Sequence, residues 1–308
     1  MAAIQAAPVW LDRERSVDKA CRLISQAAER GAVLAAFGEA WLPGYPGWTA
    51  TQGRRGGLRL AETYLDQAVE IPGPSTDLLC QAAKEADLDV VIGVVERDPA
   101  TAGTTYCTLL FLGADGSIFG KHRNLRPTSG ERTVWGDGDA VGLRVHERPY
   151  GRISALNCSE HNMVLPGYVL MAQGTQVHVV AAPGDPAPPA RSVGQQLLLA
   201  RAFASQGACY VVCVGSVEDE HAPPDDPSPG APPRAGMSAI VDPFGEVIAG
   251  PVEGESLVVA PVSQATIRLA KATCDVGGHS ARHDIFRLSV DRRVLTGLVT
   301  DADDRQES

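Results

Sequence analysis

The amino-acid sequence predicts one mixed α/β (or α+β) sandwich domain, with helices packed outside its sheets. Strand-like and helix-like segments alternate from the start of the chain, which is typical of βαβ units, and two later segments have the pattern of β-hairpins. The chain has no internal repeat, coiled-coil heptad or linker that would divide it. We therefore expect a single domain over residues 1–291 and a short polar tail at 292–308.

The first half of the chain has the pattern of βαβ units. Ser16 is the expected N-cap of a helix, and the apolar stripe that follows at helical spacing stops before Gly31. The short, continuous apolar segments on either side suit buried strands. The expected elements are, in order, strand 3–7, helix 16–28, strand 32–37, helix 76–87 and strand 89–95.

The second half adds hairpins to these units. The turn sequences Asp115-Gly116 and 242–245 each lie between two strand-like runs, as in a β-hairpin. A stretch rich in Pro, Asp and Gly at 221–234 is expected to be a surface loop. The remaining expected elements are hairpin 105–123, strand 153–156, helix 166–173, strand 176–181, helix 191–205, strand 208–214 and hairpin 237–247.

The overall charge argues against nucleic acid and anionic membranes as partners. The net charge is −10, so there is no basic excess to neutralise phosphates. No apolar run approaches the roughly 18 residues that span a bilayer, and no leader pattern precedes the first strand-like segment. The seven cysteines are dispersed and odd in number, which is typical of free thiols in a reducing compartment. We therefore expect a cytoplasmic protein.

Cys158 is the strongest candidate for chemistry. It stands where an apolar strand ends and a helical segment begins, in the sequence NCSEHN at 157–162. A thiol at such a junction faces the first free N–H groups of the helix, which favour the thiolate and can receive an oxyanion. A buried structural cysteine is the alternative interpretation.

Glu39 and Lys121 are the candidate partners of this thiol. Glu39 ends a buried apolar strand, where a carboxylate is costly unless it is paired or used. Lys121 follows the predicted hairpin, in a cationic run that could also be a plain surface edge.

Taken together, these residues resemble the site of the nitrilase superfamily, and the resemblance extends over almost the whole chain. Several motifs that carry it indicate the true nitrilase branch rather than the amidase branches. The motifs are QAAPVWLD at 5–12, EAWLPGYP at 39–46, AVEIPGP at 68–74, KHRNLRPT at 121–128, ER at 131–132, VWG at 134–136, GD at 138–139, SAIVDPFGE at 238–246 and GHSARHD at 278–284.

The resemblance implies a four-layer αββα sandwich and a catalytic triad of Glu39, Lys121 and Cys158, with Glu131 as an additional glutamate that holds the triad and substrate. It also implies that no cofactor or metal is needed. The residues expected to bind the substrate are Tyr45, Trp48, His122, Ser159, Glu160 and His161.

Four departures from the family's pattern lie near the site, and one of them is Asn162, in a stretch that varies between branches. Ser159 follows the nucleophile, where an aromatic residue is usual. Asn124 stands where a second lysine is common, and Gly38 stands where a proline usually precedes the glutamate. These departures concern the substrate and the product more than the nucleophile.

The expected activity is hydrolysis of a small organic nitrile by water to the carboxylic acid and ammonia, through a thioimidate and a thioester on Cys158. The alternatives are an amidase, or a nitrile- or cyanide-hydrating enzyme that stops at the amide, and a family member that has lost turnover and serves in binding or assembly. A homodimer or a larger homo-oligomer is expected from the resemblance.

Overall fold

The computed structural model describes residues 1–50, 54–186, 194–221 and 233–295. Its strands form two six-stranded sheets and one two-stranded ribbon. The first sheet, in spatial order, contains β14 (Ser256–Val259), β1 (Ala2–Gln5), β2 (Leu34–Ala36), β3 (Asp89–Arg97), β4 (Thr105–Leu112) and β5 (Ile118–Arg123). The second contains β13 (Val247–Ala249), β12 (Ala239–Val241), β10 (Tyr210–Gly215), β8 (Val177–Ala182), β7 (Gly151–Asn157) and β6 (His146–Arg148). The ribbon pairs β9 (Asp185–Pro186) with β11 (Arg234–Gly236).

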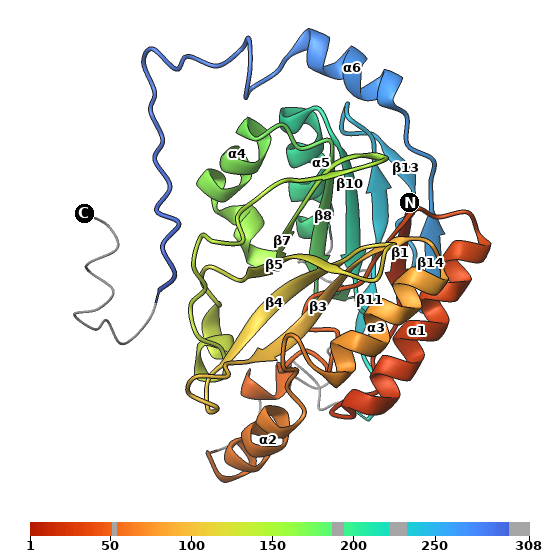
Figure 1. The fold of residues 1–308 in the computed structure, drawn as a ribbon, viewed down its shortest axis with the longest axis vertical. Helices are drawn as coiled ribbons and strands as arrows, with labels where there is room; N and C mark the ends of the chain where they lie inside the picture. Colours follow the sequence, from red (N-terminus) through yellow and green to blue (C-terminus); the bar gives the residue numbers. More distant parts are fainter. Residues whose placement is uncertain (51–53, 187–193, 222–232, 296–308) are drawn as a thin grey trace.

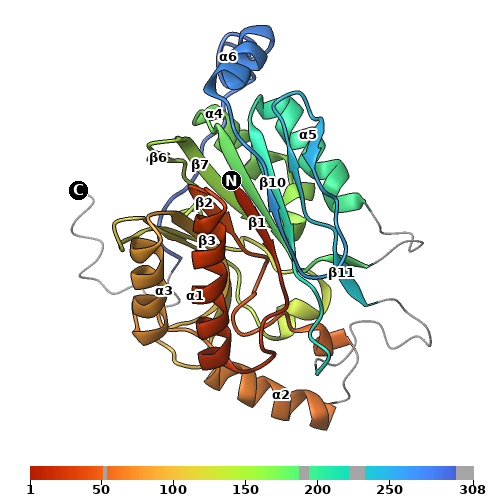
Figure 2. The ribbon, with the colours of Figure 1, turned by 90° about the vertical axis from the view of Figure 1, so that its right-hand side faces the viewer.

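Helices cover the outer face of each sheet. The α-helices are α1 (Arg13–Glu29), α2 (Arg54–Asp66), α3 (Pro74–Glu85), α4 (Val164–Ala172), α5 (Gln195–Gly207) and α6 (Gln264–Thr273). Three short 3₁₀ helices are η1 (Gly47–Ala50), η2 (Ser129–Thr133) and η3 (Cys158–Asn162). Figures 1 and 2 show α1 and α3 on one side of the molecule and α4 and α5 on the other, with the two sheets between them.

The core has three layers that correspond to this arrangement. The outer layer of the first sheet joins helix residues such as Ile24 and Leu79 to Ile92 of β3. The middle layer lies between the sheets and includes Leu109 and Val179. The outer layer of the second sheet joins residues of α4 and α5 to β8 and β10; it includes Met171, Ala200, Phe203, Val180 and Val211. The αββα sandwich is therefore confirmed.

Local sequence signals explain the ends of two helices. Asp12 caps α1, since its side chain accepts a hydrogen bond from the Arg15 N–H. Pro74 stands at the first position of α3, where the backbone N–H would have no partner inside the helix. No helix in the described part of the chain is long and apolar enough to cross a membrane.

Several elements differ from those expected from the sequence. The short α2, β6, β14 and α6 were missed, and β14 closes the first sheet by pairing antiparallel with β1. The predicted turn at 242–245 does join two strands, β12 and β13. Most of the predicted loop at 221–234, the start of the predicted helix at 191–205 and most of the tail at 292–308 lie outside the described residues. The domain boundary at residue 291 stays a prediction.

Candidate active site

Cys158 lies at the junction between a strand and a short helix, as its sequence predicts. The strand β7 ends at Asn157, and Cys158 is the first residue of η3. Its Sγ accepts a hydrogen bond from Nε2 of Gln196 on α5, at 3.2 Å. Burial raises the pKa of the thiol well above its ordinary value, and the nearby carboxyl groups of Glu39 and Glu131 raise it further; the hydrogen bond from the Ser159 N–H acts in the opposite direction. These surroundings favour the thiol form of Cys158, not the thiolate expected from the helix terminus.

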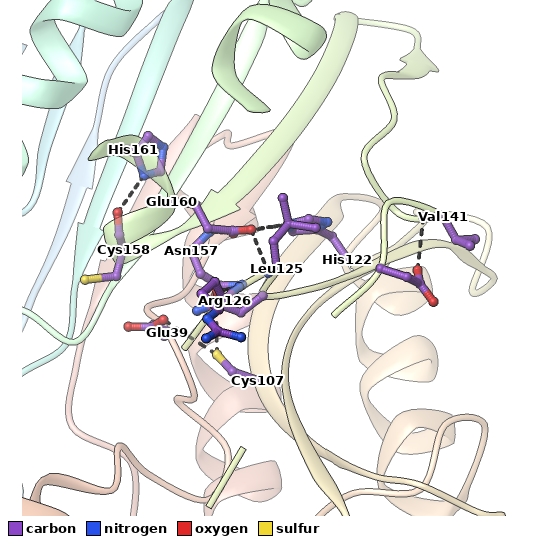
Figure 3. A network of polar contacts seen from close by, with 12 residues as sticks. Glu39, Cys107, His122, Leu125, Arg126, Val141, Asn157, Cys158, Glu160 and His161 are labelled. Carbon is purple, nitrogen blue, oxygen red and sulfur yellow. Dashed lines mark hydrogen bonds and ion pairs between the residues drawn. The ribbon is translucent and has the colours of Figure 1, made fainter. Parts of the chain in front are cut away.

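Glu39 lies between the two sheets, close to this thiol (Figure 3). Its backbone N–H donates to the Ala182 carbonyl of the second sheet, at 3.2 Å. Its side chain is fully buried, and Oε1 accepts a long hydrogen bond from the thiol of Cys107, at 3.6 Å. The other oxygen, Oε2, has no hydrogen-bond partner among the residues that the structure describes. Such an oxygen is available to a substrate or to water.

The electrostatic surroundings of Glu39 favour its neutral form. Burial is the largest cause of a pKa that lies well above the ordinary value of a carboxyl group, and the negative charge of Glu131 is the second. Hydrogen bonds from Cys107 and Cys158 act in the opposite direction without reversing the shift. Among the described residues, no lysine or arginine forms an ion pair with this carboxyl group.

Two glycines shape the backbone that presents Glu39. A Cβ atom on Gly38 would collide with the Ser216 hydroxyl and lie 2.7 Å from the Ala182 carbonyl oxygen. A Cβ atom on Gly93 of β3 would lie 2.8 Å from the Cα atom of Glu39. The absence of a side chain at both positions lets the Glu39 segment pack closely against both sheets, which accounts for glycine at position 38.

Glu131 and Tyr45 form a hydrogen-bonded pair beside Glu39. The Tyr45 hydroxyl donates to Oε1 of Glu131 at 2.6 Å, and the N–H of Thr128 donates to Oε2 at 2.5 Å. Burial, followed by the charges of Glu131 and Glu39, raises the pKa of Tyr45 well above its ordinary value. The tyrosine therefore stays a hydroxyl donor, and Glu131 is held in place near Glu39.

The structure does not bring Lys121 to Glu39 and Cys158, as the predicted triad would require. Lys121 pairs with Leu110 in the register of β4 and β5, and Leu110 packs into the outer layer of the core under α1 and α3. Its Nζ donates to Oε1 of Glu96 at 2.5 Å. Lys121 is thus on the outer, helix-covered face of the sheet.

Asn124, three residues after Lys121, lies on the inner face of the first sheet, toward Glu39. Its N–H donates to the Cys107 carbonyl at 2.7 Å, so the two residues are cross-strand neighbours on one face, and the Cys107 thiol touches Glu39. Asn124 is 1% exposed, and its Nδ2 has no hydrogen-bond partner in the described part of the chain. Where the resemblance expects a second lysine, the inner face presents an uncharged amide.

His122 and Glu160 do not line a substrate pocket, contrary to expectation. Both are fully buried and bonded to each other, with His122 Nε2 2.9 Å from Glu160 Oε1 (Figure 3). Glu160 also accepts from the N–H groups of Leu125 and Asn157. Burial raises the pKa of Glu160, but the charge and hydrogen bond of His122 outweigh it and the net shift is downward. This hydrogen-bonded pair ties η3 to β5 and the segment after it.

The other expected pocket residues have mixed placements. Trp48 is buried in a cluster that contains Tyr64 and Trp135, so it packs rather than binds. Ser159 is partly exposed next to the nucleophile. The Nδ1 atom of His161 contacts the Cys158 carbonyl oxygen at 2.9 Å.

Sequence reasoning missed two residues that contact the central pair. Cys107 bridges Glu39 and Asn157, since its thiol lies 3.6 Å from an oxygen of each. Gln196 contacts the nucleophile from α5. A cysteine in an apolar strand has the same signal as any core residue, and Gln196 is separated from Cys158 by 38 positions. No sequence pattern pointed to either.

Cys158 and the buried Glu39 thus lie together between the two sheets of an αββα sandwich. The chain belongs to the carbon–nitrogen hydrolase family, whose sequence model matches residues 1–272. It is 50% identical to a protein called nitrilase 2 from an unknown prokaryotic organism, over 98% of this chain and 96% of the relative. It is 34% identical to an aliphatic nitrilase of Rhodococcus rhodochrous, over 97% of this chain and 84% of that protein.

The solved structures share the fold at lower sequence identity. Nit3 of Saccharomyces cerevisiae, a member of branch 10 of the nitrilase superfamily, superposes with a TM-score of 0.72 at 18% identity. The match covers 92% of this chain and 96% of that one. The two sheets and their helices are therefore common to distant members of the superfamily.

Proposed function

We propose that this protein hydrolyses an organic nitrile to its carboxylic acid and ammonia, with Cys158 as the nucleophile and Glu39 as the acid–base group. The observation that carries the proposal is the buried Glu39 carboxyl group beside the Cys158 thiol, with one carboxyl oxygen unpartnered among the described residues. Membership in the carbon–nitrogen hydrolase family and the 50% identity to a protein called a nitrilase support it.

The raised pKa values of both groups favour a first step between neutral partners. One oxygen of the Glu39 carboxyl group accepts the thiol proton while the other donates its own proton to the nitrile nitrogen. The sulfur forms a bond to the nitrile carbon, and the product is a neutral thioimidate. Glu39 finishes with the same number of protons as it began with. No charge builds up that would require a lysine.

Two water molecules complete the reaction. The first adds to the thioimidate carbon as Glu39 accepts one of its protons and delivers one to nitrogen, and ammonia leaves to give a thioester. The second water releases the acid and restores the thiol. Three groups support these steps: the Ser159 N–H as a donor beside the reacting centre, the Asn124 amide on the same face, and the Tyr45–Glu131 pair that holds the carboxyl group in place.

The test is simultaneous measurement of ammonia, acid and amide from the purified protein on a panel of aliphatic, aromatic and arylaliphatic nitriles and their amides. The expected result is acid and ammonia in equal amounts from nitriles, with amides unchanged. Amide as the main product without ammonia would show that the enzyme stops after the first water addition. Turnover of amides alone would assign an amidase.

We also propose that the protein works as a homodimer or a larger assembly in the cytoplasm. Several large apolar side chains are exposed on α4, α5 and the segment after α6: Val164, Leu165, Leu198, Ile285 and Phe286. Exposed apolar residues in such numbers are typical of an interface. Light scattering at micromolar concentration should give at least twice the mass of one chain. All seven cysteines are free thiols, which suits a reducing compartment, and cell fractionation tests the location.

A further inference from the structure

A chain of hydrogen-bonding side chains leads from the nucleophile's backbone into the second sheet. His161 Nδ1 lies 2.9 Å from the Cys158 carbonyl oxygen, and its Nε2 lies 3.0 Å from Nε2 of His178. His178 Nδ1 lies 2.8 Å from the Ser154 hydroxyl, which is 2.7 Å from the hydroxyl of Thr175. His178, Ser154 and Thr175 are fully buried. Neither histidine has a part in the proposed acid–base steps.

The geometry allows one arrangement of protons along the two imidazoles. A carbonyl oxygen can only accept, so His161 carries its proton on Nδ1. Burial is the largest cause of a lowered pKa for both rings, so both are neutral. The Nε2 atom of His161 is therefore a bare acceptor, and His178 must donate to it from its own Nε2. The Nδ1 atom of His178 is then the acceptor for the Ser154 hydroxyl.

The same arrangement excludes His161 as the base that activates Cys158. Its protonated nitrogen is committed to the backbone carbonyl, and its bare nitrogen faces His178 instead of the thiol. Among the described residues, the Cys158 thiol forms a hydrogen bond with Gln196 of α5 and with neither histidine. A Cys–His dyad is therefore ruled out, although the two residues are only three positions apart.

The ring of His178 is fixed by packing as well as by hydrogen bonds. It stacks on the ring of Phe203 from α5, with centroids 3.9 Å apart and an angle of 13° between the planes. His161 contacts the same phenyl ring edge-on, with centroids 6.1 Å apart. Gln196, which contacts the Cys158 thiol, lies on the same helix as Phe203. His161 thus contacts the backbone carbonyl of Cys158, and Gln196 of α5 contacts its thiol.

We infer that His178 is a positioning residue for Cys158: by donating to His161 it fixes that ring in the Nδ1–H tautomer, which holds the Cys158 carbonyl and so aims the thiol. This inference rests on the proposed role of Cys158 as the nucleophile. A small displacement of a reacting atom costs on the order of 100-fold in rate. The contribution of His178 is thus one of orientation, without contact to the substrate.

The first test is spectroscopic and needs no turnover. In the full chain labelled with ¹⁵N-histidine, long-range ¹H–¹⁵N spectra should show His161 as the Nδ1–H tautomer and His178 as the Nε2–H tautomer. The His178→Phe variant keeps an aromatic ring against Phe203 but removes the donor, and His161 should then lose its single tautomer. An unchanged His161 signal in that variant would overturn the inference, as would two wild-type rings in the same tautomer.

The second test is kinetic. His178→Phe should lower kcat by about 10- to 100-fold with KM changed by less than about 3-fold, because orientation and not binding is lost. His178→Gln keeps an N–H donor in place of Nε2 and should restore most of kcat. An unchanged kcat in the phenylalanine variant, or equal loss in both folded variants, would contradict the role as donor.

Two further variants keep the test decisive. His146→Phe replaces a partly buried histidine outside this chain of contacts, one that packs on Phe111 and Phe119, and should change neither kcat nor the His161 signal. If His178→Phe does not fold, Ser154→Ala removes the proton donated to His178 Nδ1 and should disturb both ring signals. A wild-type protein that turns over no nitrile would refute the proposed function, while the spectra would still support or overturn the tautomer assignment.

Discussion

Two buried glutamates, one on each face of the first sheet, have opposite acid–base properties. Glu96 on the outer face accepts hydrogen bonds from Lys121 and Arg123. Burial raises its pKa, but the hydrogen bonds from Arg123 and Lys121 outweigh this, and the net shift is downward. Glu39 on the inner face is equally buried, accepts hydrogen bonds from the thiols of Cys107 and Cys158, and has a raised pKa. Burial alone therefore does not determine the protonation state; the neighbouring cations do.

The two glutamates also differ in how many hydrogen bonds they accept, and this suits them to different roles. The outer glutamate is ionised, paired and surrounded by donors, so it is suited to holding β3, β4 and β5 together. The inner glutamate has a raised pKa, which favours its neutral form, and one of its oxygens has no hydrogen-bond partner among the described residues. A charged, saturated carboxylate has no proton or lone pair to spare for a substrate, whereas a neutral one can donate and accept at once.

The largest expected effect is that of removing the nucleophile. Cys158→Ala should lower turnover by about 10⁴-fold or more, because no other described side chain replaces the sulfur that bonds to the substrate. The fold should survive, since Cys158 is partly exposed. Steady-state ammonia release and thermal melting measure the two properties. Cys80→Ala, which removes a buried thiol from the outer layer, is the matched control and should keep full activity. An active Cys158→Ala protein would refute the assignment.

The second effect sharpens the comparison between the two glutamates. Glu39→Gln should lower kcat by about 10²- to 10⁴-fold. A carboxyl group with a raised pKa contributes stability below its unfolded-state pKa and loses it as pH rises through the folded-state pKa. The Glu39→Gln protein should therefore melt above the wild type at pH 8, with no such gain at pH 4. Melting curves across this range provide the measurement, and a lower melting temperature at pH 8 would argue against a neutral Glu39.

Glu96→Gln should change the melting temperature in the opposite direction to Glu39→Gln. A carboxyl group with a lowered pKa contributes stability above its unfolded-state pKa, and this is lost as pH falls through the folded-state pKa. The variant should melt below the wild type at pH 7, and the difference should shrink toward pH 3. Its kcat should stay within about 3-fold, because the hydrogen-bond partners of Glu96 lie on the outer face. Loss of activity comparable to that of Glu39→Gln would break the comparison.

A cation placed on the inner face should change the pH dependence of catalysis. Asn124→Lys puts an ammonium group near Glu39, which favours its ionised form and lowers its pKa. If the neutral carboxyl group is the active form, the alkaline limb of the pH–rate profile should move to lower pH. The ratio of activity at pH 9 to that at pH 6 should fall about 10-fold. Asn124→Leu adds no charge and serves as the control. If the alkaline limb of the pH–rate profile stays at the same pH in Asn124→Lys, the proposal that neutral Glu39 is the active form is wrong.

The smallest expected effect tests the placement of Lys121. Lys121→Met should keep kcat and KM within about 3-fold, because Nζ contacts Glu96 on the outer face. The melting temperature should fall by only a few degrees, because Arg123 still pairs with Glu96. Arg123→Met provides a matched control on the same carboxylate. Complete loss of activity in Lys121→Met would mean that the lysine reaches the inner face during catalysis.

The error over Lys121 has a specific structural cause. A strand places alternate side chains on opposite faces, so a shift of one residue exchanges the faces. The pairing of β4 with β5 shifts between Phe111 and Leu112, as at a β-bulge, next to Phe119. Ile118 packs in the outer layer and Phe119 in the middle layer. The apolar residues of β5 therefore do not indicate which of its later residues face the inner side of the sheet. The sequence predicted the strand but could not predict which of its residues faces the site.

Other parts of the prediction depended on local signals and were correct. The alternating strands and helices, the hairpin around Asp115-Gly116 and the strand before Cys158 each depend on residues close in sequence. The fold class and the carbon–nitrogen hydrolase family follow from such patterns and are confirmed. His122 and Glu160 were placed near the site but given the wrong contacts, since their partnership joins positions 38 residues apart.

By itself, the sequence determined the chemical groups that this protein can use: a thiol at a strand–helix junction, a carboxyl group at the end of a buried strand, and the family to which both belong. Only the tertiary structure decided how these groups ionise and which of them meet. The pKa of Glu39 depends on burial between two sheets and on the nearby carboxyl group of Glu131. Both are set by the phase of strands and by contacts between distant segments, because electrostatic energies depend on distance in space and not on separation along the chain.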